Sequence, residues 1–312
     1  MKSVTQNHFP QVVFRNGKKM LWNPIERKPL VNRPEERVRL RLAEYLVLEA
    51  EWSKHRISIE APVEVSASTN PLRSDLIVYT DELEPYLLAE CKAESVRLSE
   101  KTAIQTARYN TSVEAPFLLI TNGITDFWFE ILNGKPVLLD SPPVPAKAAP
   151  SVYQAEFKYW QNRGFAGNNS GSLIRKWCRR NLPVLWNPEL PWQRHYLDIK
   201  REIVDLNLSH DYRIIRFDSD TRFAITLLGS EHGSSFFTAI LNHQHQNIGV
   251  SITNLVIVAA GEKVNTTLYS SRDSISLDIR KELPFEFNMD NPRIIENFPE
   301  FLHRYFKKHL PF

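Results

Sequence analysis

The sequence has few of the residues that cross-link secreted proteins. Its two cysteines, Cys91 and Cys178, lie far apart in the chain, which excludes a disulfide framework and a zinc-finger spacing. The N-terminal residues lack the apolar core of a secretory signal, and no run approaches the roughly 18 apolar residues of a membrane span. These absences predict a cytoplasmic protein that does not contact a membrane.

A strong charge of one sign is also missing. The formal net charge of +3 is too small to indicate a polyanionic partner by itself. The hydrophobic fraction of 42% and the charged fraction of 24% are ordinary for a folded chain and exclude extensive disorder. Any affinity for nucleic acid would therefore depend on local patches of basic side chains.

The length of 312 residues predicts two domains, and one segment is a clear boundary. The stretch SPPVPAKAAPS, residues 141–151, contains four prolines, which restrict the backbone and remove hydrogen-bond donors. We therefore expect a first domain at 1–140, a proline-rich linker at 141–151 and a second domain at 152–312.

The first domain alternates helical and strand patterns. Hydrophobic periodicity and turn residues predict a hairpin at 12–22 around Asn16-Gly17, a helix at 35–52, strands at 57–65, 74–80 and 86–92, a helix from Ser99 to Asn110, and strands at 115–121 and 125–132. The turn between the strands at 74–80 and 86–92 is short, so these two strands should be antiparallel neighbours. The order predicts an α/β domain with a mixed sheet flanked by helices.

The second domain has a different pattern. Residues 151–208 are predicted to be helical and aromatic with loops at the prolines, residues 211–287 to be rich in strands, including one at 250–260, and residues 292–310 to form a final helix. This pattern is typical of an α+β domain, whose role the sequence does not indicate.

Charged side chains occur at the ends of two apolar strands of the first domain. Asp75 opens one strand, and Glu90 and Lys92 end the next on one face, because side chains alternate along a strand. In an antiparallel pair, the start of one strand lies beside the end of the other. We therefore expect Asp75 to meet Glu90 and Lys92 at one edge of the sheet.

Two adjacent carboxylates repel each other unless a cation separates them. Magnesium is the expected cofactor, with manganese as an alternative, because it binds hard oxygen ligands and leaves positions for water and phosphate. A nearby lysine can orient or deprotonate the attacking water, so the cluster predicts hydrolysis of a phosphodiester. The acid-x-Lys spacing is weak evidence by itself, because it recurs at Glu26/Lys28, Glu156/Lys158 and Asp198/Lys200. The alternative is an ordinary ion pair at a strand end.

The helix that follows Lys92 carries two further polar candidates. Gln105 and Tyr109 are four residues apart and share one helix face, where an amide and a hydroxyl could contact a phosphate or a base. The alternative is a polar helix face with Tyr109 partly in the core.

Together these stretches resemble a known family. Residues 21–131, including RSDLIVY, PYLLAECKAESVRLSEKTAIQTARYN and FLLITNG, resemble the N-terminal nuclease domain of type I restriction enzyme R subunits, within the PD-(D/E)xK nuclease superfamily. The resemblance implies a restriction-endonuclease-like fold. It also implies that Asp75 and Glu90 bind the metal, that Lys92 is catalytic and that Gln105 and Tyr109 support DNA cleavage.

The resemblance implies one further metal ligand and has two departures. A glutamate on the first helix should complete the metal site, and Glu35 and Glu36 both remain candidates. Ser74 stands where the family usually has proline or alanine before the aspartate. The chain contains no GxxxxGK[ST] phosphate loop, so neither ATP binding nor the family's ATP-driven translocation is expected.

A basic patch is predicted in the second domain. The stretch SLIRKWCRRN places Arg175, Lys176, Arg179 and Arg180 around Trp177 on a helix, a pattern that suits a nucleic-acid backbone. The alternative is a solvated helix face with Trp177 in the core.

The sequence thus predicts a magnesium-dependent nuclease that acts on nucleic acid, with DNA as the expected substrate. The second domain would bind substrate, a protein partner or a second copy of the chain. The rival hypothesis is a non-catalytic nucleic-acid-binding or scaffold protein that retains the fold.

Overall fold

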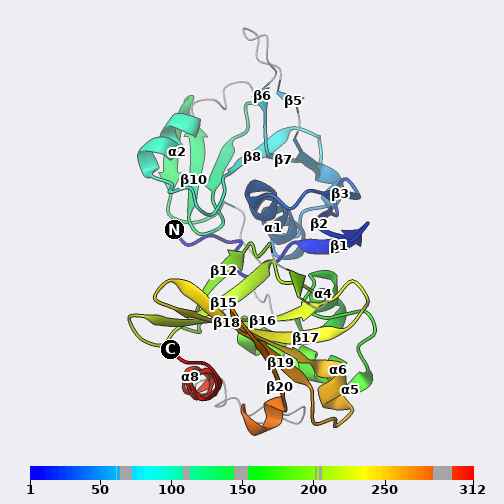
Figure 1. Ribbon diagram of the computed structural model, residues 1–312. Coiled ribbons are helices and arrows are strands. Elements are labelled where there is room, and N and C mark those ends of the chain that lie inside the picture. The colour runs from blue at the N-terminus through cyan, green and yellow to red at the C-terminus, as the bar shows by residue number, and fades with distance from the viewer. Residues whose placement is uncertain are drawn as a thin grey trace. The chain divides into compact units, whose positions relative to one another are not determined.

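The computed structural model describes residues 1–60, 62–63, 72–107, 113–143, 154–200, 202–203, 206–283 and 297–312. The chain divides into two compact units, Met1–Pro150 and Ser151–Phe312 (Figure 1). Most of the segment predicted as a linker, from residue 144 onward, lies outside the described residues.

The first unit is built on a six-stranded mixed sheet. Across the sheet the strands are β11 (Lys135–Leu139), β10 (Asp126–Leu132), β9 (Phe117–Thr121), β8 (Pro85–Cys91), β7 (Leu76–Tyr79) and β4 (Ile57–Ile59). β8 and β9 are parallel and every other neighbouring pair is antiparallel. The mixed α/β architecture predicted from the sequence is therefore confirmed, whereas β11 was not predicted.

Among the described residues of this unit, α1 (Pro34–Leu48) and α2 (Glu100–Ala107) cover the sheet. α1 packs with one set of sheet residues, including Ala89 and Cys91 of β8. Ala103 of α2 belongs to a second core cluster, against which Leu88 of β8 packs. Because side chains alternate along a strand, Glu90 lies on the same face as Leu88. α2 is the crossover that a parallel pair such as β8 and β9 requires.

Short strands complete the first unit. β1 (Gln11–Arg15), β2 (Lys18–Asn23) and β3 (Lys28–Leu30) form a separate antiparallel sheet. The predicted hairpin turn is confirmed, because Asn16 and Gly17 have φ of 50° and 73°, as a two-residue type I′ turn requires. The predicted strand at 57–65 is wrong in its length: β4 ends at Ile59, and β5 (Pro62–Val63) pairs instead with β6 (Leu72–Arg73).

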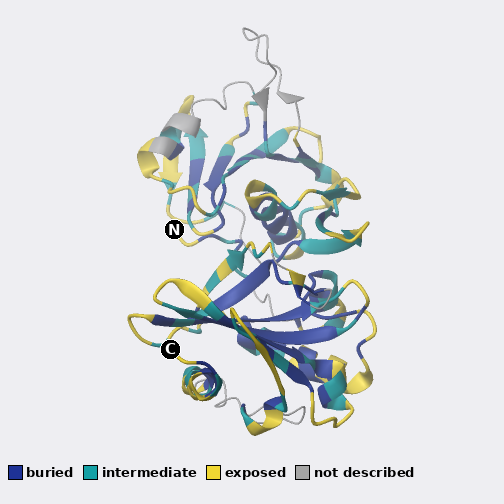
Figure 2. Cartoon of the chain, in the orientation of Figure 1, coloured by how far each residue is buried: buried dark blue, intermediate teal, exposed yellow. Residues whose placement is uncertain are grey.

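The second unit contains a seven-stranded antiparallel sheet whose strands follow one another along the chain. They are β12 (Gln193–Leu197), β15 (His210–Arg216), β16 (Thr221–Gly229), β17 (Ser235–His243), β18 (Gln246–Asn254), β19 (Thr266–Tyr269) and β20 (Ser274–Leu277). A two-stranded ribbon, β13 (Glu202–Ile203) and β14 (Leu206–Asn207), interrupts the order after β12. Figure 2 shows that the central strands β16 and β17 are mostly buried.

The helices in the described part of this unit are α4 (Phe157–Asn162), α5 (Ser172–Leu185), α6 (Leu255–Ala259) and α8 (Phe298–His309). α8 lies against one face of the sheet, where Phe306 stacks on Phe223 with ring centroids 5.8 Å apart. On the same face, the Tyr305 hydroxyl is 2.8 Å from the Ser251 hydroxyl. The α+β architecture predicted for this part of the chain is confirmed.

Two element predictions for the second unit are wrong in part. Residues 151–208 are not helical throughout, because β12 joins the large sheet. The run predicted as a strand at 250–260 begins as β18 but turns into α6, where the Asn254 side chain caps the helix by accepting from the Val256 amide. None of the helices in the described residues is long and apolar enough to cross a membrane.

The turn between β9 and β10 provides a test of how α1 is held against the sheet. Gly123 has φ +77°, its carbonyl accepts from Arg41 Nη2 at 3.0 Å, and an added Cβ would lie 3.1 Å from Arg41 Nη1. Gly134 has φ +73° but open space around it. Alanine at either position should cost about 1 kcal/mol in backbone strain. We expect Gly123→Ala to lose about 1 kcal/mol more than Gly134→Ala, measured by urea unfolding; equal losses would show that the contact with Arg41 adds nothing.

Candidate active site

The ends of β7 and β8 bring three predicted site residues together. Leu76 pairs with Ala89, so Asp75 and Glu90 are the next residues at the same margin of the sheet. The Asp75 Oδ2 accepts a hydrogen bond of 2.7 Å from the Cys91 amide, which fixes this carboxylate against β8. The structure thus places Asp75 beside the Glu90 to Lys92 segment.

Glu90 and Lys92 form an ion pair on one face of this strand end. The Lys92 ammonium lies 2.5 Å from Glu90 Oε1, and both side chains are partly exposed. Burial raises the pKa of Glu90, and the nearby charge of Asp75 raises it further, so that the opposing effect of Lys92 is outweighed. Two carboxylates are therefore crowded at the margin and favour an additional positive charge.

Arg39 of α1 supplies a positive charge to Asp75 at this margin of the sheet. Its guanidinium contacts Asp75 Oδ1 at 2.6 Å, Glu36 Oε1 at 2.9 Å and Glu60 Oε1 at 3.1 Å. The Arg39 side chain is only 7% exposed. Burial alone would lower the pKa of Arg39, but the charges of Asp75 and Glu36 raise it above its ordinary value. Arg39 therefore neutralises several carboxylates at once.

Sequence reasoning missed Arg39, although one signal was present. Arg39 lies between the apolar Val38 and Leu40 on a helix whose buried positions are mostly apolar, with Arg41 and Glu44 as the other charged ones. Its spacing of three residues from Glu36 also allows an ion pair on one helix face. A basic residue at the edge of an apolar stripe usually requires a buried acidic partner, and Asp75 is that partner.

The two glutamates left open by the sequence lie in different surroundings. Glu36 is half-buried and contacts Arg39, whereas Glu35 is exposed. The second carboxylate oxygen of Glu36 is buried and makes no hydrogen bond within the described residues. Burial raises the pKa of Glu36 despite the opposing charge of Arg39. Of the two glutamates, Glu36 is the one that shares a cluster with Asp75.

The carboxylates of this cluster are of the kind that binds a divalent cation. Asp75, Glu90 and Glu36 offer the hard oxygen atoms that magnesium prefers, and one of these oxygens is buried without a partner. Within the described part of the chain, however, no group of three acidic, histidine or cysteine side chains is close enough to hold a metal ion. The chemistry of the residues fits a divalent cation, while Arg39 occupies the position between Glu36 and Asp75.

The remaining predicted candidates of the first unit cannot be placed at this site. Gln105 belongs to α2, but its side chain lies outside the described part, as does the whole of Tyr109. Their roles therefore remain predictions.

The predicted basic patch lies on α5 of the second unit. Arg175, Lys176, Arg179 and Arg180 are all exposed, whereas Trp177 and Cys178 are buried in the core. Two of the basic groups also stabilise local structure, because Arg175 Nε donates to the Ser170 carbonyl at 2.7 Å and Arg179 Nε to the Ala155 carbonyl at 3.1 Å. The solvated-face alternative thus accounts for Trp177, and binding by the four basic side chains remains a prediction.

Comparison with known proteins connects the first unit to one family. Residues 34–140 match the family model of the type I restriction enzyme R protein N terminus. The match runs from the start of α1 to the end of β11 and includes Glu36, Asp75, Glu90 and Lys92. It confirms the resemblance inferred from the sequence over about a third of the chain. No curated protein matches the chain.

The raised pKa of Glu90 predicts a pH-dependent stability effect. Because the folded-state pKa lies above the ordinary value of 4.5, ionised Glu90 opposes folding above the folded-state pKa, and this penalty disappears below pH 4.5. Glu90→Gln should therefore raise the melting temperature by a few degrees at neutral pH in EDTA, with the difference vanishing in acid.

Glu82→Gln, an exposed change in the turn before β8, is the control and should leave the melting temperature unchanged across the same pH range. Thermal unfolding followed by circular dichroism gives the comparison. A Glu90→Gln protein that is less stable than the unmodified protein at neutral pH would contradict the inferred crowding of negative charge.

Proposed function

We propose that the first unit is a metal-dependent nuclease that hydrolyses phosphodiester bonds, with DNA as its substrate. The observation that carries this proposal is the meeting of Asp75, Glu90 and Lys92 at one sheet margin, inside the segment that matches the restriction-enzyme family. The family match supports a nuclease-related role, and the geometry supplies the groups that such chemistry needs.

Asp75, Glu90 and Glu36 are the proposed metal-binding residues, with Mg²⁺ as the cofactor and Mn²⁺ as an alternative. A bound divalent ion would polarise the scissile phosphate and lower the pKa of a water molecule. The unpartnered oxygen of Glu36 and the raised pKa values of Glu36 and Glu90 support this assignment, because each indicates a carboxylate that favours a further cation.

Lys92 is proposed to hold the attacking water and to neutralise charge on the phosphate. Burial lowers the pKa of Lys92, but its hydrogen bond to Glu90 and the charges of Glu90 and Asp75 raise the pKa above its ordinary value. Lys92 therefore carries its proton at neutral pH, which favours orientation and electrostatic stabilisation over removal of a proton from water.

Arg39 is proposed to stabilise the metal-free protein. It now neutralises Asp75 and Glu36, the same carboxylates that we assign to the cation. A divalent ion would have to compete with this guanidinium. If Arg39 keeps its ion pairs with Glu36 and Asp75 in the presence of a divalent ion, no metal can bind there. That result would favour the rival function, a nucleic-acid-binding or scaffold protein without catalysis.

Plasmid nicking in the presence of Mg²⁺ tests the catalytic assignment. We expect Asp75→Asn, Glu90→Gln and Lys92→Met each to reduce the rate at least about a hundredfold, because each removes a group that acts on the reacting phosphate or its cation. Glu36→Gln should reduce the rate, whereas Glu35→Gln, one residue earlier and exposed, should not.

The outcomes separate the two functions. Cleavage that survives all of these substitutions indicates a contaminating nuclease. The absence of cleavage of DNA and RNA with Mg²⁺ or Mn²⁺, together with retained folding, establishes the non-catalytic alternative.

The competition between Arg39 and a metal can be measured without activity. Arg39→Met should lose about 3 kcal/mol of stability in EDTA, because it leaves partly buried carboxylates without their cation. Mn²⁺ should then raise the melting temperature of Arg39→Met more than that of the unmodified protein, since binding to the folded state stabilises it.

Arg37→Met is the matched control. It lies on the same helix, and its guanidinium donates to Asn32 Oδ1 at 2.9 Å. Adding Asp75→Asn to Arg39→Met should abolish the response to Mn²⁺. A response that persists in this double variant would place the metal elsewhere.

A further inference from the structure

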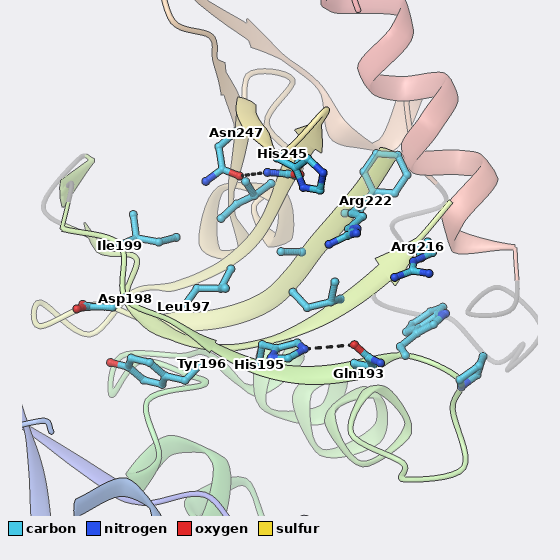
Figure 3. Close-up of a pocket in the computed structure, with 17 residues that line it drawn as sticks. Gln193, His195, Tyr196, Leu197, Asp198, Ile199, Arg216, Arg222, His245 and Asn247 are labelled. Atoms are coloured by element: carbon cyan, nitrogen blue, oxygen red, sulfur yellow. Dashed lines mark hydrogen bonds between the residues drawn. The ribbon is translucent and has the colours of Figure 1, made fainter. Parts of the chain in front are cut away.

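A groove lies in the second unit on the side of the large sheet opposite α8. Its volume is about 830 Å³, within the roughly 300–1,000 Å³ typical of ligand sites. Figure 3 shows the groove above β12 and the neighbouring strands, with polar side chains around it. Every residue that lines it belongs to the second unit, so the groove does not depend on how the two units are arranged.

One end of the groove carries two adjacent guanidinium groups. Arg216 of β15 pairs directly with Arg222 of β16, so the two side chains project from the same face of neighbouring strands. Within the described residues, neither guanidinium has an acidic partner among the ion pairs. Like charges placed directly opposite each other repel, and a bound anion would relieve that repulsion.

The next residues across the sheet from these two arginines carry amide side chains. Arg222 pairs with Asn242, and Asn242 donates a hydrogen bond of 2.9 Å to the Asn247 side chain. At the β12 side, His195 Nε2 lies 3.3 Å from Gln193 Oε1 (Figure 3). These groups can both donate and accept hydrogen bonds, as recognition of the edge of a nucleic-acid base requires.

The floor of the groove is apolar. Leu197, Ile214, Ala224 and Ile240 line it and belong to or pack against one core cluster that contains Tyr212. This face of the sheet thus combines an aliphatic floor with two cations at one end and amides along its margin. The simplest alternative is an ordinary solvated sheet face, but that alternative does not account for two adjacent arginines beside a groove of this volume.

We propose that this groove binds a nucleoside phosphate, either as a free nucleotide or as part of a single nucleic-acid strand. Arg216 and Arg222 would contact the phosphate, since guanidinium groups match phosphate oxygens in charge and geometry. The base would lie on the aliphatic floor with its edge toward the amides. A duplex is a poor ligand, because its bases are stacked inside the helix and do not reach such a floor.

This inference concerns the second unit and does not require the first unit to cut its substrate. Binding is therefore measured on the full chain in EDTA, where metal-dependent cleavage cannot occur. The probes are fluorescein-labelled oligodeoxythymidylate for the single strand, a labelled duplex of the same length, and AMP by calorimetry for the free nucleotide.

The decisive variant is Arg216→Gln combined with Arg222→Gln. We expect it to weaken binding of the single strand about ten- to a hundredfold, because each charge-assisted contact to phosphate is lost. The slope of log K against log salt should also fall by about 0.7, since both arginines contact one phosphate and each phosphate contact to a single strand contributes about 0.7.

The matched control is Arg304→Gln combined with Lys307→Gln. Both residues are exposed on α8, which covers the other face of the sheet, and the change in charge is the same. This variant should bind nearly as well as the unmodified protein. Circular dichroism establishes that both double variants are folded.

The arms of the experiment distinguish the possible sources of the phosphate. Binding of the strand that is lost only in the Arg216/Arg222 variant supports a nucleic-acid strand, and the same pattern with AMP alone supports a free nucleotide. The proposal is overturned if neither probe binds, if the duplex binds as tightly as the single strand, or if both double variants weaken binding equally.

Discussion

The salt bridge between Arg39 and Asp75 is the interaction on which the candidate site of the first unit depends. It crosses from α1 to the start of β7 and joins the helix to the sheet margin at 2.6 Å. A buried guanidinium needs several acceptors, and Glu36 and Glu60 supply them from two different elements. The pair therefore fixes both the position of α1 and the direction in which Asp75 points.

The placement of Glu90 and Lys92 follows from a second constraint, the alternation of side chains on β8. Ala89 and Cys91 enter the core under α1, which leaves Glu90 and Lys92 on the other face. β8 is central in the sheet, with antiparallel β7 on one side and parallel β9 on the other. Charged side chains on such a strand avoid burial only where the strand ends, at the margin of the sheet. The register with β7 then brings Asp75 alongside, and no adjustable loop is needed to assemble the three groups.

Much of this arrangement could be predicted from the sequence because it depends on local rules. The Asn16-Gly17 turn, the antiparallel pairing of β7 and β8 and the mixed sheet all follow from turn chemistry, short connections and periodicity. Arg39 could not be placed in the same way, because its main partner, Asp75, is 36 residues away and the pair exists only after α1 has packed. The choice between Glu35 and Glu36 likewise depends on which side of α1 faces the sheet. In the second unit, the change from β18 to α6 inside one apolar run could not be predicted from hydrophobicity, because a short continuous apolar run fits a buried strand and a buried helix equally well.

The cost of holding like charges together connects the stability of the first unit with its proposed chemistry. Burial raises the pKa values of Glu36 and Glu90, so the folded protein is less stable at neutral pH than it would be with neutral side chains at these positions. A structural ion-pair network would be expected to balance its charges, whereas the two cations Arg39 and Lys92 contact four carboxylates, those of Glu36, Glu60, Asp75 and Glu90. One oxygen of Glu36 also stays buried without a hydrogen bond. A bound divalent cation would reduce this electrostatic cost at neutral pH, where protonation does not, and this is the reason for assigning to the metal the same carboxylates that destabilise the metal-free protein.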